Sequence, residues 1–283
     1  MLKLLQQFEK RAAQPLRVLL LGKHVQAQVD QEKRYWDRFL RCFLQFLQRT
    51  KGCFDIYCAS VLKILRAFFN YLLEDRLLPV GKYHKRFVLP VPQPIPLVLA
   101  PERLRFLIED EPFERSLPPQ LQRAKDVFVF GCTVGLRFSD LMRLERKCLQ
   151  QSSQGPLLTL HTQKTGMPVR LPLPPYAARI LLRYGKKGSK YLLPYLSCTN
   201  LNLQVKELCA RAGWTEPIPK IRFKEGRPRE IRGKNGKTLR FCDQVTAHTM
   251  RRTAITTLLI LDVPELVVRR LSGHAPGSRE FFR

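Results

Sequence analysis

Large apolar residues recur at helical spacing through the first part of the chain. Between residues 31 and 49 they fall on one face of a helix, and charged residues fall on the other faces. The same pattern returns between residues 58 and 76. These stripes predict two amphipathic helices that bury their apolar sides in a common core. We therefore expect residues 1–88 to form a helical N-terminal domain.

The stretch from residue 89 to residue 101 breaks this periodicity. It holds five prolines, which cannot continue a helix because each lacks the backbone N–H and clashes with the preceding turn. We interpret residues 89–101 as a stiff, extended linker. Basic residues precede it, so it can serve as a strap across a nucleic-acid backbone or simply as a spacer between domains.

Helical periodicity resumes after Pro101 and is interrupted once by strand-like alternation. Residues 157–174 alternate around a K-T-G turn, which predicts a β-hairpin with Lys164 at or beside its tip. Helices are predicted on both sides of this hairpin, at residues 119–133, 175–185 and 199–212 and from Thr246 onwards. We therefore expect residues 102–283 to form a second, mostly helical domain, and the whole chain to be mainly α with a small β-hairpin or sheet.

The segment from about residue 215 to residue 243 is dense in Lys, Arg, Gly and Pro. This composition predicts a mobile loop that becomes ordered on nucleic acid or, alternatively, a solvated and disordered insert. No site residue is assigned to it.

A strong positive charge accompanies this globular pattern. The chain has 50 Lys plus Arg against 23 Asp plus Glu, a formal net charge of +27, while 45% of its residues are hydrophobic. Such a protein repels itself unless it meets a polyanion, which makes double-stranded DNA or RNA the leading partner. Anionic lipid and a basic surface kept for solubility are the alternatives. Four cations on the predicted N-terminal helices are candidate DNA-phosphate contacts or merely hydrated charges: Arg34, Arg38, Lys63 and Arg66.

Cysteine spacing and hydropathy indicate the cellular compartment in which we expect the protein. The eight cysteines form no C-x-x-C pair and lie mostly within apolar runs, so we expect them to be reduced. The same spacing disfavours a zinc site. No run reaches the roughly 18 uninterrupted apolar residues of a membrane span, and no convincing signal peptide is present. We expect a soluble cytoplasmic protein with no membrane partner, associated with the nucleoid if its source is prokaryotic.

Two motifs far apart in the sequence place basic side chains where they can act on a phosphate. T-V-G-L-R-F-S-D puts Arg137 on a tight turn between predicted helices. H-T-M-R-R-T puts His248 and Arg251 on one face of a helix, and a later S-G-H ends at His274. Two guanidinium groups can hold the nonbridging oxygens of a phosphodiester as their charge rises during attack. Lys164 can act as a general acid, and the histidines can hydrogen-bond the phosphate or move a proton.

The order and context of these motifs resemble the tyrosine site-specific recombinases, the phage integrase family. Its boxes read like T-G-L-R-x-S-E-L and H-x-L-R-H-T followed by L-G-H, and here they read T-V-G-L-R-F-S-D-L, H-T-M-R-R-T and L-S-G-H. The resemblance covers nearly the whole chain and implies a two-domain DNA clamp, with a helical core-binding domain and a mostly helical catalytic domain. It implies that Arg137 and Arg251 form an arginine clamp, that Lys164 is the hairpin lysine, and that His248 and His274 complete the site.

The resemblance also implies a reaction. Strands would be cut and rejoined through a 3′-phosphotyrosine intermediate that stores the bond energy, so neither a metal nor another cofactor is needed. The result would be DNA recombination or integration, as in a mobile genetic element, by a tetramer assembled on DNA. The poverty of suitably placed carboxylates near the motifs is consistent with chemistry that uses no metal ion.

The chain departs from the family pattern at two positions. Arg252 stands where the second box usually has a histidine. The family's nucleophilic tyrosine follows the last histidine by a short step that lands on or just beyond Arg283, where this chain ends. We therefore expect the chain to bind DNA without cleaving it and to be monomeric away from DNA. A longer natural protein and a remnant that has lost its catalytic end both explain the missing tyrosine.

Two other functions are compatible with the same residues. A noncatalytic accessory protein or repressor derived from a recombinase would keep DNA binding and lack the chemistry. A basic RNA-binding protein would display base-stacking aromatics on exposed strands, whereas the aromatics here follow buried helical stripes. Recombinase and accessory protein therefore share one prediction, which is binding to duplex DNA.

Overall fold

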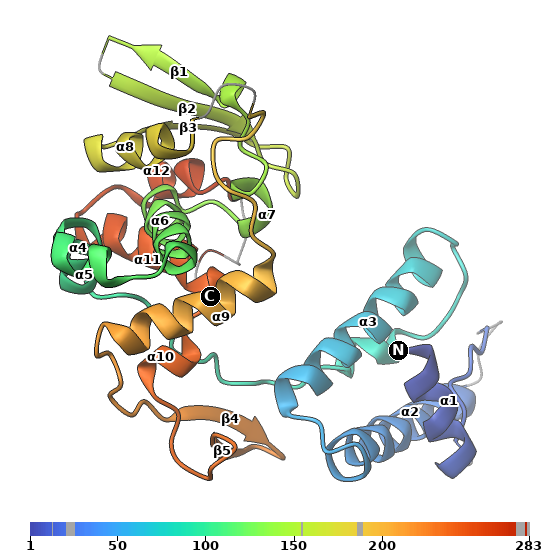
Figure 1. Cartoon of the computed structure of the whole chain (residues 1–283). Helices are drawn as coiled ribbons and strands as arrows, with labels where there is room; N and C mark the ends of the chain where they lie inside the picture. Colours follow the sequence, from blue (N-terminus) through green and yellow to red (C-terminus); the bar gives the residue numbers. More distant parts are fainter. Residues whose placement is uncertain (13, 21–25, 154, 186–188, 276–280, 282–283) are drawn as a thin grey trace. The chain divides into compact units, whose positions relative to one another are not determined.

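The computed structural model divides the chain into two compact units (Figure 1). The first comprises Met1–Pro94 together with Lys220–Arg232, and the second comprises Ile95–Pro219 together with Gly233–Arg283. The chain therefore passes between the units three times, at residues 94–95, 219–220 and 232–233. The structure describes residues 1–12, 14–20, 26–153, 155–185, 189–275 and 281.

The first unit is built from helices and one β-hairpin. Its helices are α1 (Leu2–Ala12), α2 (Gln26–Gln45), which continues as a π-helical turn (Phe46–Thr50), α3 (Asp55–Glu74) and a 3₁₀ turn (Lys82–Arg86). Its hairpin consists of β4 (Lys220–Lys224) and β5 (Arg227–Ile231). Helices α2 and α3 are the two amphipathic helices that the apolar stripes predicted, with bounds that differ by a few residues.

Aromatic side chains fill the core of the first unit. Phe8 from α1 meets Phe39 and Phe43 from α2 edge-on, with ring centroids 5.4 and 5.0 Å apart. Trp36 meets Phe69 of α3 in the same way at 5.2 Å. Each such pair adds roughly 0.5–1.5 kcal/mol beyond the area that it buries. The apolar stripes of the sequence are therefore the contacts that join the three helices.

Helix α3 is apolar on more than one side. Its core face is buried through Cys58, Val61, Leu62, Leu65 and Phe69. Ile64, Phe68 and Tyr71 are exposed on another side. In the described part of the chain, α3 is the one helix long and apolar enough to cross a membrane by length and composition alone. Core helices of soluble proteins meet the same criterion, and Phe69 of α3 packs on Trp36 in the core of the first unit.

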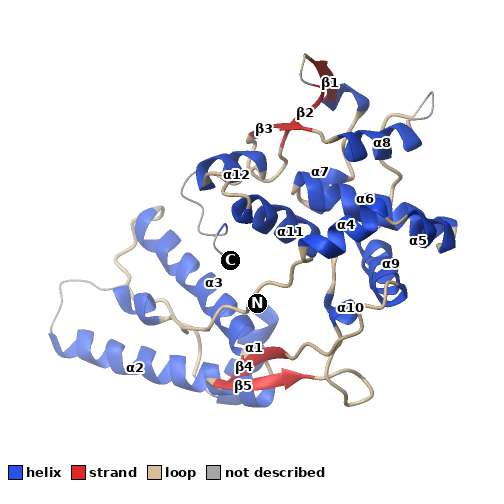
Figure 2. Cartoon of the chain, turned by 90° about the vertical axis from the view of Figure 1, so that its left-hand side faces the viewer, coloured by secondary structure: helices blue, strands red, loops and turns tan. Residues whose placement is uncertain are grey.

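The second unit combines a helical bundle with a three-stranded antiparallel sheet in the order β1-β2-β3 (Figure 2). The helices are α4 (Pro101–Glu109), α5 (Glu111–Ser116), α6 (Pro119–Val134), α7 (Phe138–Leu141), α8 (Pro175–Tyr184), α9 (Cys198–Arg211), α10 (Phe241–Gln244), α11 (Ala247–Ile260) and α12 (Glu265–Leu271). The strands are β1 (Leu149–Ser152), β2 (Gly155–His161) and β3 (Pro168–Pro172). Leu158 pairs with Leu171 and Leu160 with Val169, and all four are buried. This buried face confirms the predicted hairpin, and the mainly α fold class is confirmed with it.

Helix α6 is the central element of the second unit, where it packs against α4, α8, α9 and α11. Gly131 permits the close approach of α11, because a Cβ there would lie 2.4 Å from Sδ of Met250. The helix ends at Gly135, whose φ of 63° is the left-handed conformation that glycine adopts without strain. The chain turns sharply at this glycine, and Arg137 lies in the short connection to α7.

The segment from 215 to 243 differs from the prediction of a mobile loop or disordered insert, because residues 220–231 form the β4–β5 hairpin. Lys224 pairs with Arg227, so Glu225 and Gly226 make a two-residue turn. Both have positive φ, 52° and 72°, as a type I′ turn requires. For Glu225 this conformation costs on the order of 1 kcal/mol.

The turn of this hairpin is held by a buried carboxylate. Asp55, at the start of α3, is 2% exposed. It accepts hydrogen bonds from the backbone N–H of Glu225 at 2.9 Å and of Gly226 at 2.8 Å. These contacts explain why residues 220–232 pack with the first unit, although the sequence pattern assigned them to the second domain.

Candidate active site

Arg137 follows the sharp turn at the end of α6. Its backbone is extended, with φ −64° and ψ 146°, and α7 begins at the next residue. The side chain is half-buried, and its Nη1 donates to the carbonyl oxygen of Gly273 at 3.5 Å. The first motif therefore directs a guanidinium towards the segment that follows α12.

Arg251 lies near the start of α11 and is buried, with 5% of its surface exposed. Thr246 and Thr249 start this helix with reciprocal capping hydrogen bonds. Arg251 Nη1 donates to the carbonyl oxygens of Gly135 at 3.0 Å and of Ser272 at 2.6 Å. A buried arginine needs acceptors for its N–H groups, and these two carbonyls meet that need while setting the direction of the guanidinium.

His274 is buried beside Arg251 and accepts a hydrogen bond from it. Arg251 Nη2 lies nearest to His274 Nε2, at 2.9 Å, and an arginine can only donate. Ser272 Oγ lies 2.7 Å from Nδ1 of the same ring and donates to the carbonyl oxygen of Val268 at 2.6 Å. Nδ1 therefore carries the hydrogen that Ser272 accepts. This chain of hydrogen bonds sets both the tautomer and the orientation of the imidazole.

Gly273 is the residue at which the separate segments meet. Its φ is 66°, and a Cβ there would lie 2.5 Å from Cγ2 of Thr162 in the turn after β2. Its carbonyl oxygen accepts from Arg137 Nη1 and also from Thr165 Oγ1, the latter at 3.1 Å. Because Thr165 follows Lys164 directly, the turn with the lysine is attached to the same residue as Arg137.

Lys164 lies in the turn between β2 and β3, and its side chain is exposed. A second contact anchors this turn, because the buried carboxylate of Asp140 accepts from the backbone N–H of Gln163 at 3.0 Å. An exposed ammonium group on an anchored turn can reach a ligand outside the fold.

His248 precedes Arg251 by one turn of α11 and is exposed. Partial loss of solvent lowers its pKa, and the positive charges of Arg252 and Arg251 lower that pKa further. The imidazole therefore stays neutral at lower pH than an isolated histidine would. The structure brings Arg137, Arg251, His274 and the Lys164 turn together at residues 272–274, and it places His248 on the helix of Arg251. Their roles in catalysis remain predictions.

Two of the tyrosines are fixed in the packing of the second unit. The hydroxyl of Tyr176 lies 3.0 Å from Thr133 Oγ1, and that of Tyr184 donates to Asp126 at 2.8 Å. Burial raises the pKa of both phenols, and the negative charge of Asp126 raises that of Tyr184 further. A raised pKa opposes ionisation, so neither hydroxyl has the character of an activated nucleophile.

Four residues that build the site were not singled out by the sequence: Asp140, Thr165, Ser272 and Gly273. Asp140 stands inside the Arg137 motif, and Ser272 and Gly273 stand inside the His274 motif. Their presence in those motifs was the available signal. Thr165 offered none, because a threonine in a β-turn is an ordinary turn residue.

The predicted DNA contacts of the first unit lie on its helices. Arg34 and Arg38 on α2 and Lys63 on α3 are exposed, and Arg66 is half-buried. Their contact with DNA remains a prediction. Among the residues that the structure describes, no three His, Cys, Asp or Glu side chains gather closely enough to hold a metal ion.

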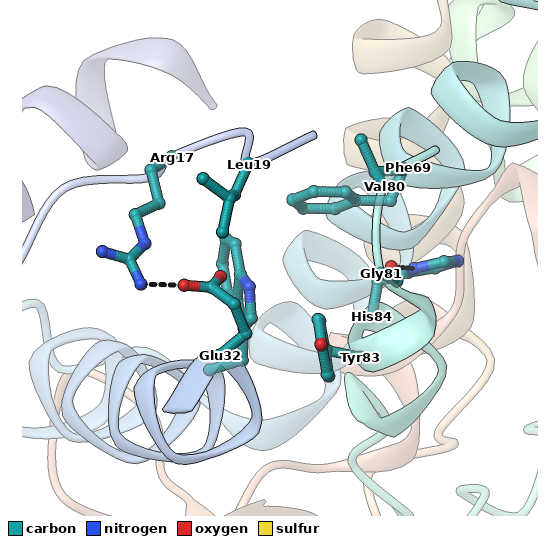
Figure 3. A pocket seen from close by; sticks show the side chains of 9 residues that line it. Arg17, Leu19, Glu32, Phe69, Val80, Gly81, Tyr83 and His84 are labelled. Carbon is teal, nitrogen blue, oxygen red and sulfur yellow. Dashed lines mark hydrogen bonds and ion pairs between the residues drawn. The ribbon is translucent and has the colours of Figure 1, made fainter. Parts of the chain in front are cut away.

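A pocket in the first unit contains none of the predicted site residues (Figure 3). Its open volume is about 10 Å³, which is room for a single water molecule. Arg17 forms an ion pair with Glu32 on one side of it. On the other side His84 stacks on Phe69, and burial lowers the pKa of this histidine. The pocket is too small for a substrate and belongs to the packing of the unit.

A wider cavity, of about 300 Å³, borders the Lys164 turn. Asp140, Thr159, His161 and Gln163 contribute to its lining. Within the described residues, Asp140 Oδ2 and Thr159 Oγ1 are buried and meet no hydrogen-bond partner. One oxygen of the Asp140 carboxylate therefore accepts a hydrogen bond from the turn, and the other has no partner among the described residues.

Neither a protein-family model nor a curated protein matches the sequence. Solved structures do match. The XerH site-specific recombinase bound to a palindromic difH substrate, in a post-cleavage complex, has a TM-score of 0.58 and 17% identity, and the match covers 85% of this chain and 65% of that one. The match to its pre-cleavage complex covers 63% of the XerH chain. The chain thus spans less than two thirds of the length of XerH.

Two integrases match over greater shares of their own length. A variant of the Tn1549 transposon integrase in complex with transposon right end DNA has a TM-score of 0.58 and 15% identity, and the match covers 97% of this chain and 84% of that one. A lambda integrase dimer bound to a COC′ core site has a TM-score of 0.53 and 13% identity, covering 99% and 93%. At these identities the likeness is one of fold, and the fold of this chain is that of the tyrosine recombinases and integrases.

Proposed function

We propose that this chain binds double-stranded DNA and serves in site-specific recombination or integration, by metal-free cleavage and rejoining of strands through a 3′-phosphotyrosine. The supporting observation is the meeting of Arg137, Arg251, His274 and the Lys164 turn at residues 272–274. These side chains come from distant parts of the sequence and are of the types that suit a phosphodiester. The fold is shared with recombinases solved on DNA.

In this proposal the scissile phosphate lies over the two arginines. Attack adds negative charge to the nonbridging oxygens, so Arg137 and Arg251 stabilise the transition state more than the ground state. Lys164 protonates the departing 5′ oxygen. His248 is neutral because of its lowered pKa, and it can take the proton of the attacking phenol. His274 orients Arg251 through their hydrogen bond.

No tyrosine of this sequence stands at the position that the family motif gives to the attacking tyrosine. The chain is therefore proposed to bind DNA without cutting it, and a longer form with the tyrosine is proposed to cut and to assemble into a tetramer on DNA. Binding and cutting then require separate experiments. For binding, the affinity for labelled duplex DNA should fall steeply as salt rises, because neutralised phosphates release counterions.

For cutting, the chain is extended past Arg283 by a segment that contains a tyrosine and is mixed with a nicked suicide substrate. We expect a covalent protein–DNA adduct. Arg137→Ala and Arg251→Ala should each slow its formation by about a hundredfold or more. The matched control is Arg115→Ala on α5, an exposed arginine paired with Glu111, which should leave the rate unchanged.

The outcomes separate the candidate functions. Adduct formation that is undiminished in both site variants would contradict the assignment of the arginines. DNA binding without any adduct from the extended chain would favour a noncatalytic accessory protein or repressor. Binding that does not respond to salt would contradict recognition of the phosphate backbone altogether.

A further inference from the structure

One face of the β4–β5 hairpin consists of cations. Successive side chains of a strand point to opposite faces, and the cross-strand register sets which residues share a face. One face carries Lys220, Arg222, Lys224, Arg227 and Arg229 with a single apolar residue, Ile231. The other face carries Ile221, Phe223, Pro228 and Glu230. The hairpin is therefore a ribbon with positive charge gathered on one side.

The cations of this face lie directly opposite one another. Arg222 pairs with Arg229, and Lys224 pairs with Arg227. Like charges in directly opposed positions destabilise a pair of strands. Arg222, Arg227 and Arg229 are exposed, so an anion from outside can reach them. Such an anion would remove the repulsion that the hairpin otherwise bears.

The carboxylates of the hairpin do not neutralise this face, because both are engaged elsewhere. Glu225 in the turn forms an ion pair with Arg49 at 3.4 Å. Glu230 on the opposite face forms one with Arg232 at 3.0 Å. The ribbon therefore presents its opposed cations without a carboxylate from its own strands between them.

The ribbon is also held in place. Both oxygens of the buried Asp55 accept backbone N–H groups of the turn, and Gln48 Nε2 donates to the same carboxylate at 2.8 Å. The guanidinium carbon of Arg222 lies 5.4 Å from the centroid of the Phe54 ring, next to Asp55. A charged surface that is already ordered loses less entropy when it binds a ligand.

We propose that the cationic face of β4–β5 binds the phosphate backbone of double-stranded DNA, and that Asp55 is the positioning residue that holds the hairpin for this contact. The inference rests on the proposed function, since it names a surface on which the DNA partner lies. Cations at alternate positions of a strand recur every 6.6–6.8 Å or so, and a row of charges matches a row of phosphates better than one small anion. Phosphate contacts do not read bases.

The test compares salt dependence in paired variants. Arg222→Gln together with Arg229→Gln removes one opposed pair. The contact of Arg222 with the Phe54 ring is lost with it, so circular dichroism must show that the variant is folded. Each lost phosphate contact reduces the magnitude of the negative slope of log affinity against log salt concentration by about 1, so the slope should become less negative by about 2. The loss should be the same for a specific and a scrambled duplex. The control is Arg115→Gln with Arg211→Gln, two exposed arginines of α5 and α9 paired with Glu111 and Glu207, and its slope should not change.

Asp55→Asn tests the positioning role. The substitution raises the net charge by one, so charge alone predicts tighter DNA binding, whereas release of the hairpin predicts weaker binding. Circular dichroism and, in a Trp214→Phe background, Trp36 fluorescence report whether the first unit of this variant is folded. Weaker binding by a folded variant supports the role of Asp55, and equal or tighter binding overturns it.

The outcomes of the salt experiment separate this inference from the proposed function. If the wild type binds duplex DNA and the Arg222/Arg229 variant keeps its slope, the hairpin is not a DNA contact and the proposed function stands. If the wild type shows no salt-dependent binding to duplex DNA, the proposed function itself fails. A loss that affects duplex RNA and spares duplex DNA would overturn the choice of partner.

Discussion

Two β-hairpins of the molecule, β2–β3 and β4–β5, hold their turns by the same device and use it to different extents. In each, a buried aspartate from another segment accepts backbone N–H groups of the turn: Asp140 from Gln163, and Asp55 from Glu225 and Gly226. Asp55 engages both carboxylate oxygens, whereas Oδ2 of Asp140 has no partner within the described residues. The buried carboxylate of the first unit thus anchors its turn with both oxygens, whereas that of the second unit anchors its turn with one oxygen.

Removal of the two carboxylates should show the largest difference. Asp55→Ala leaves two backbone N–H groups and the Gln48 amide without their acceptor, and each such loss costs about 1–3 kcal/mol. We expect the first unit to lose roughly 3 kcal/mol or more of unfolding free energy. Urea titration followed by Trp36 fluorescence measures this in a Trp214→Phe background, since the chain has two tryptophans.

The matched change in the second unit is Asp140→Ala, followed by Trp214 in a Trp36→Phe background. It deprives only the Gln163 N–H of its acceptor, so the loss should be smaller, about 1–2 kcal/mol. Equal losses of unfolding free energy in Asp55→Ala and Asp140→Ala would show that the second oxygen of Asp55 adds no stability.

Conversion of each aspartate to asparagine should change the unfolding free energies of the two units by different, smaller amounts. In Asp55→Asn an amide N–H replaces an oxygen that accepts from the turn, so we expect a loss of about 1–2 kcal/mol. In Asp140→Asn the amide oxygen can still accept from Gln163, and a buried charge with an idle oxygen is removed. Unfolding free energy should stay within about 0.5 kcal/mol of the wild type or rise. A clear loss there would reveal a donor on Oδ2.

A histidine in each unit makes stability depend on pH. In the first unit burial lowers the pKa of His84 despite the opposing effect of the Gly81 carbonyl, and in the second unit partial burial and the charges of Arg252 and Arg251 lower the pKa of His248. The unfolded state then takes up the proton more readily than the folded state. The stability from neutral His84 is complete above the unfolded pKa of about 6.5 and is lost as pH falls below it.

We therefore expect the urea midpoint of the Trp36 signal to be lower at about pH 5.5 than at about pH 7.5. His84→Gln should reduce this difference, because glutamine does not titrate. The midpoint of the Trp214 signal should move in the same direction, because the pKa of His248 in the second unit is also lowered. A Trp36 midpoint that does not move between the two pH values would contradict the prediction.

The turn residues themselves should show the smallest effects. Glu225 has a positive φ of 52°, which asparagine tolerates better than glutamate, so Glu225→Asn should stabilise the first unit by a few tenths of a kcal/mol. The exposed ion pair with Arg49 that is lost contributes little. Gly226→Ala and, in the other hairpin, Gly166→Ala should each cost about 1 kcal/mol, because φ is 72° and 63° there. Thermal unfolding of the three variants tests whether Glu225→Asn raises the melting temperature and whether the two glycine substitutions lower it.

The same comparison explains how much of the fold the sequence could predict. The β2–β3 hairpin was predictable because Leu158, Leu160, Val169 and Leu171 alternate and bury one face. Helices α2 and α3 were predictable from their apolar stripes in the same way. The β4–β5 hairpin has no buried apolar face, since Lys and Arg occupy its alternate positions. A sequence in which charged residues alternate does not distinguish an exposed strand from a solvated loop.

The site was predictable to the extent that its chemistry lies in short motifs. Arg137, Arg251 and His274 could be named because each stands in a string of characteristic residues. The hydrogen bonds that orient them could not, because the Arg251 to Ser272 contact depends on how the chain returns after α12. The same holds for Thr165 and Gly273, which come from different elements and meet only in the folded unit.

The threefold passage of the chain between the units has a consequence for dissecting the protein. A protease that cuts within residues 89–101 would separate the N-terminal helices covalently from the rest of the chain, and only noncovalent contacts such as those of Asp55 with the β4–β5 turn would still hold the two fragments together. A gene fragment that encodes residues 1–88 alone would lack that hairpin, and its Asp55 carboxylate would face water in place of the turn. Expressed pieces of this protein should therefore carry residues 220–232 if the first unit is to be whole.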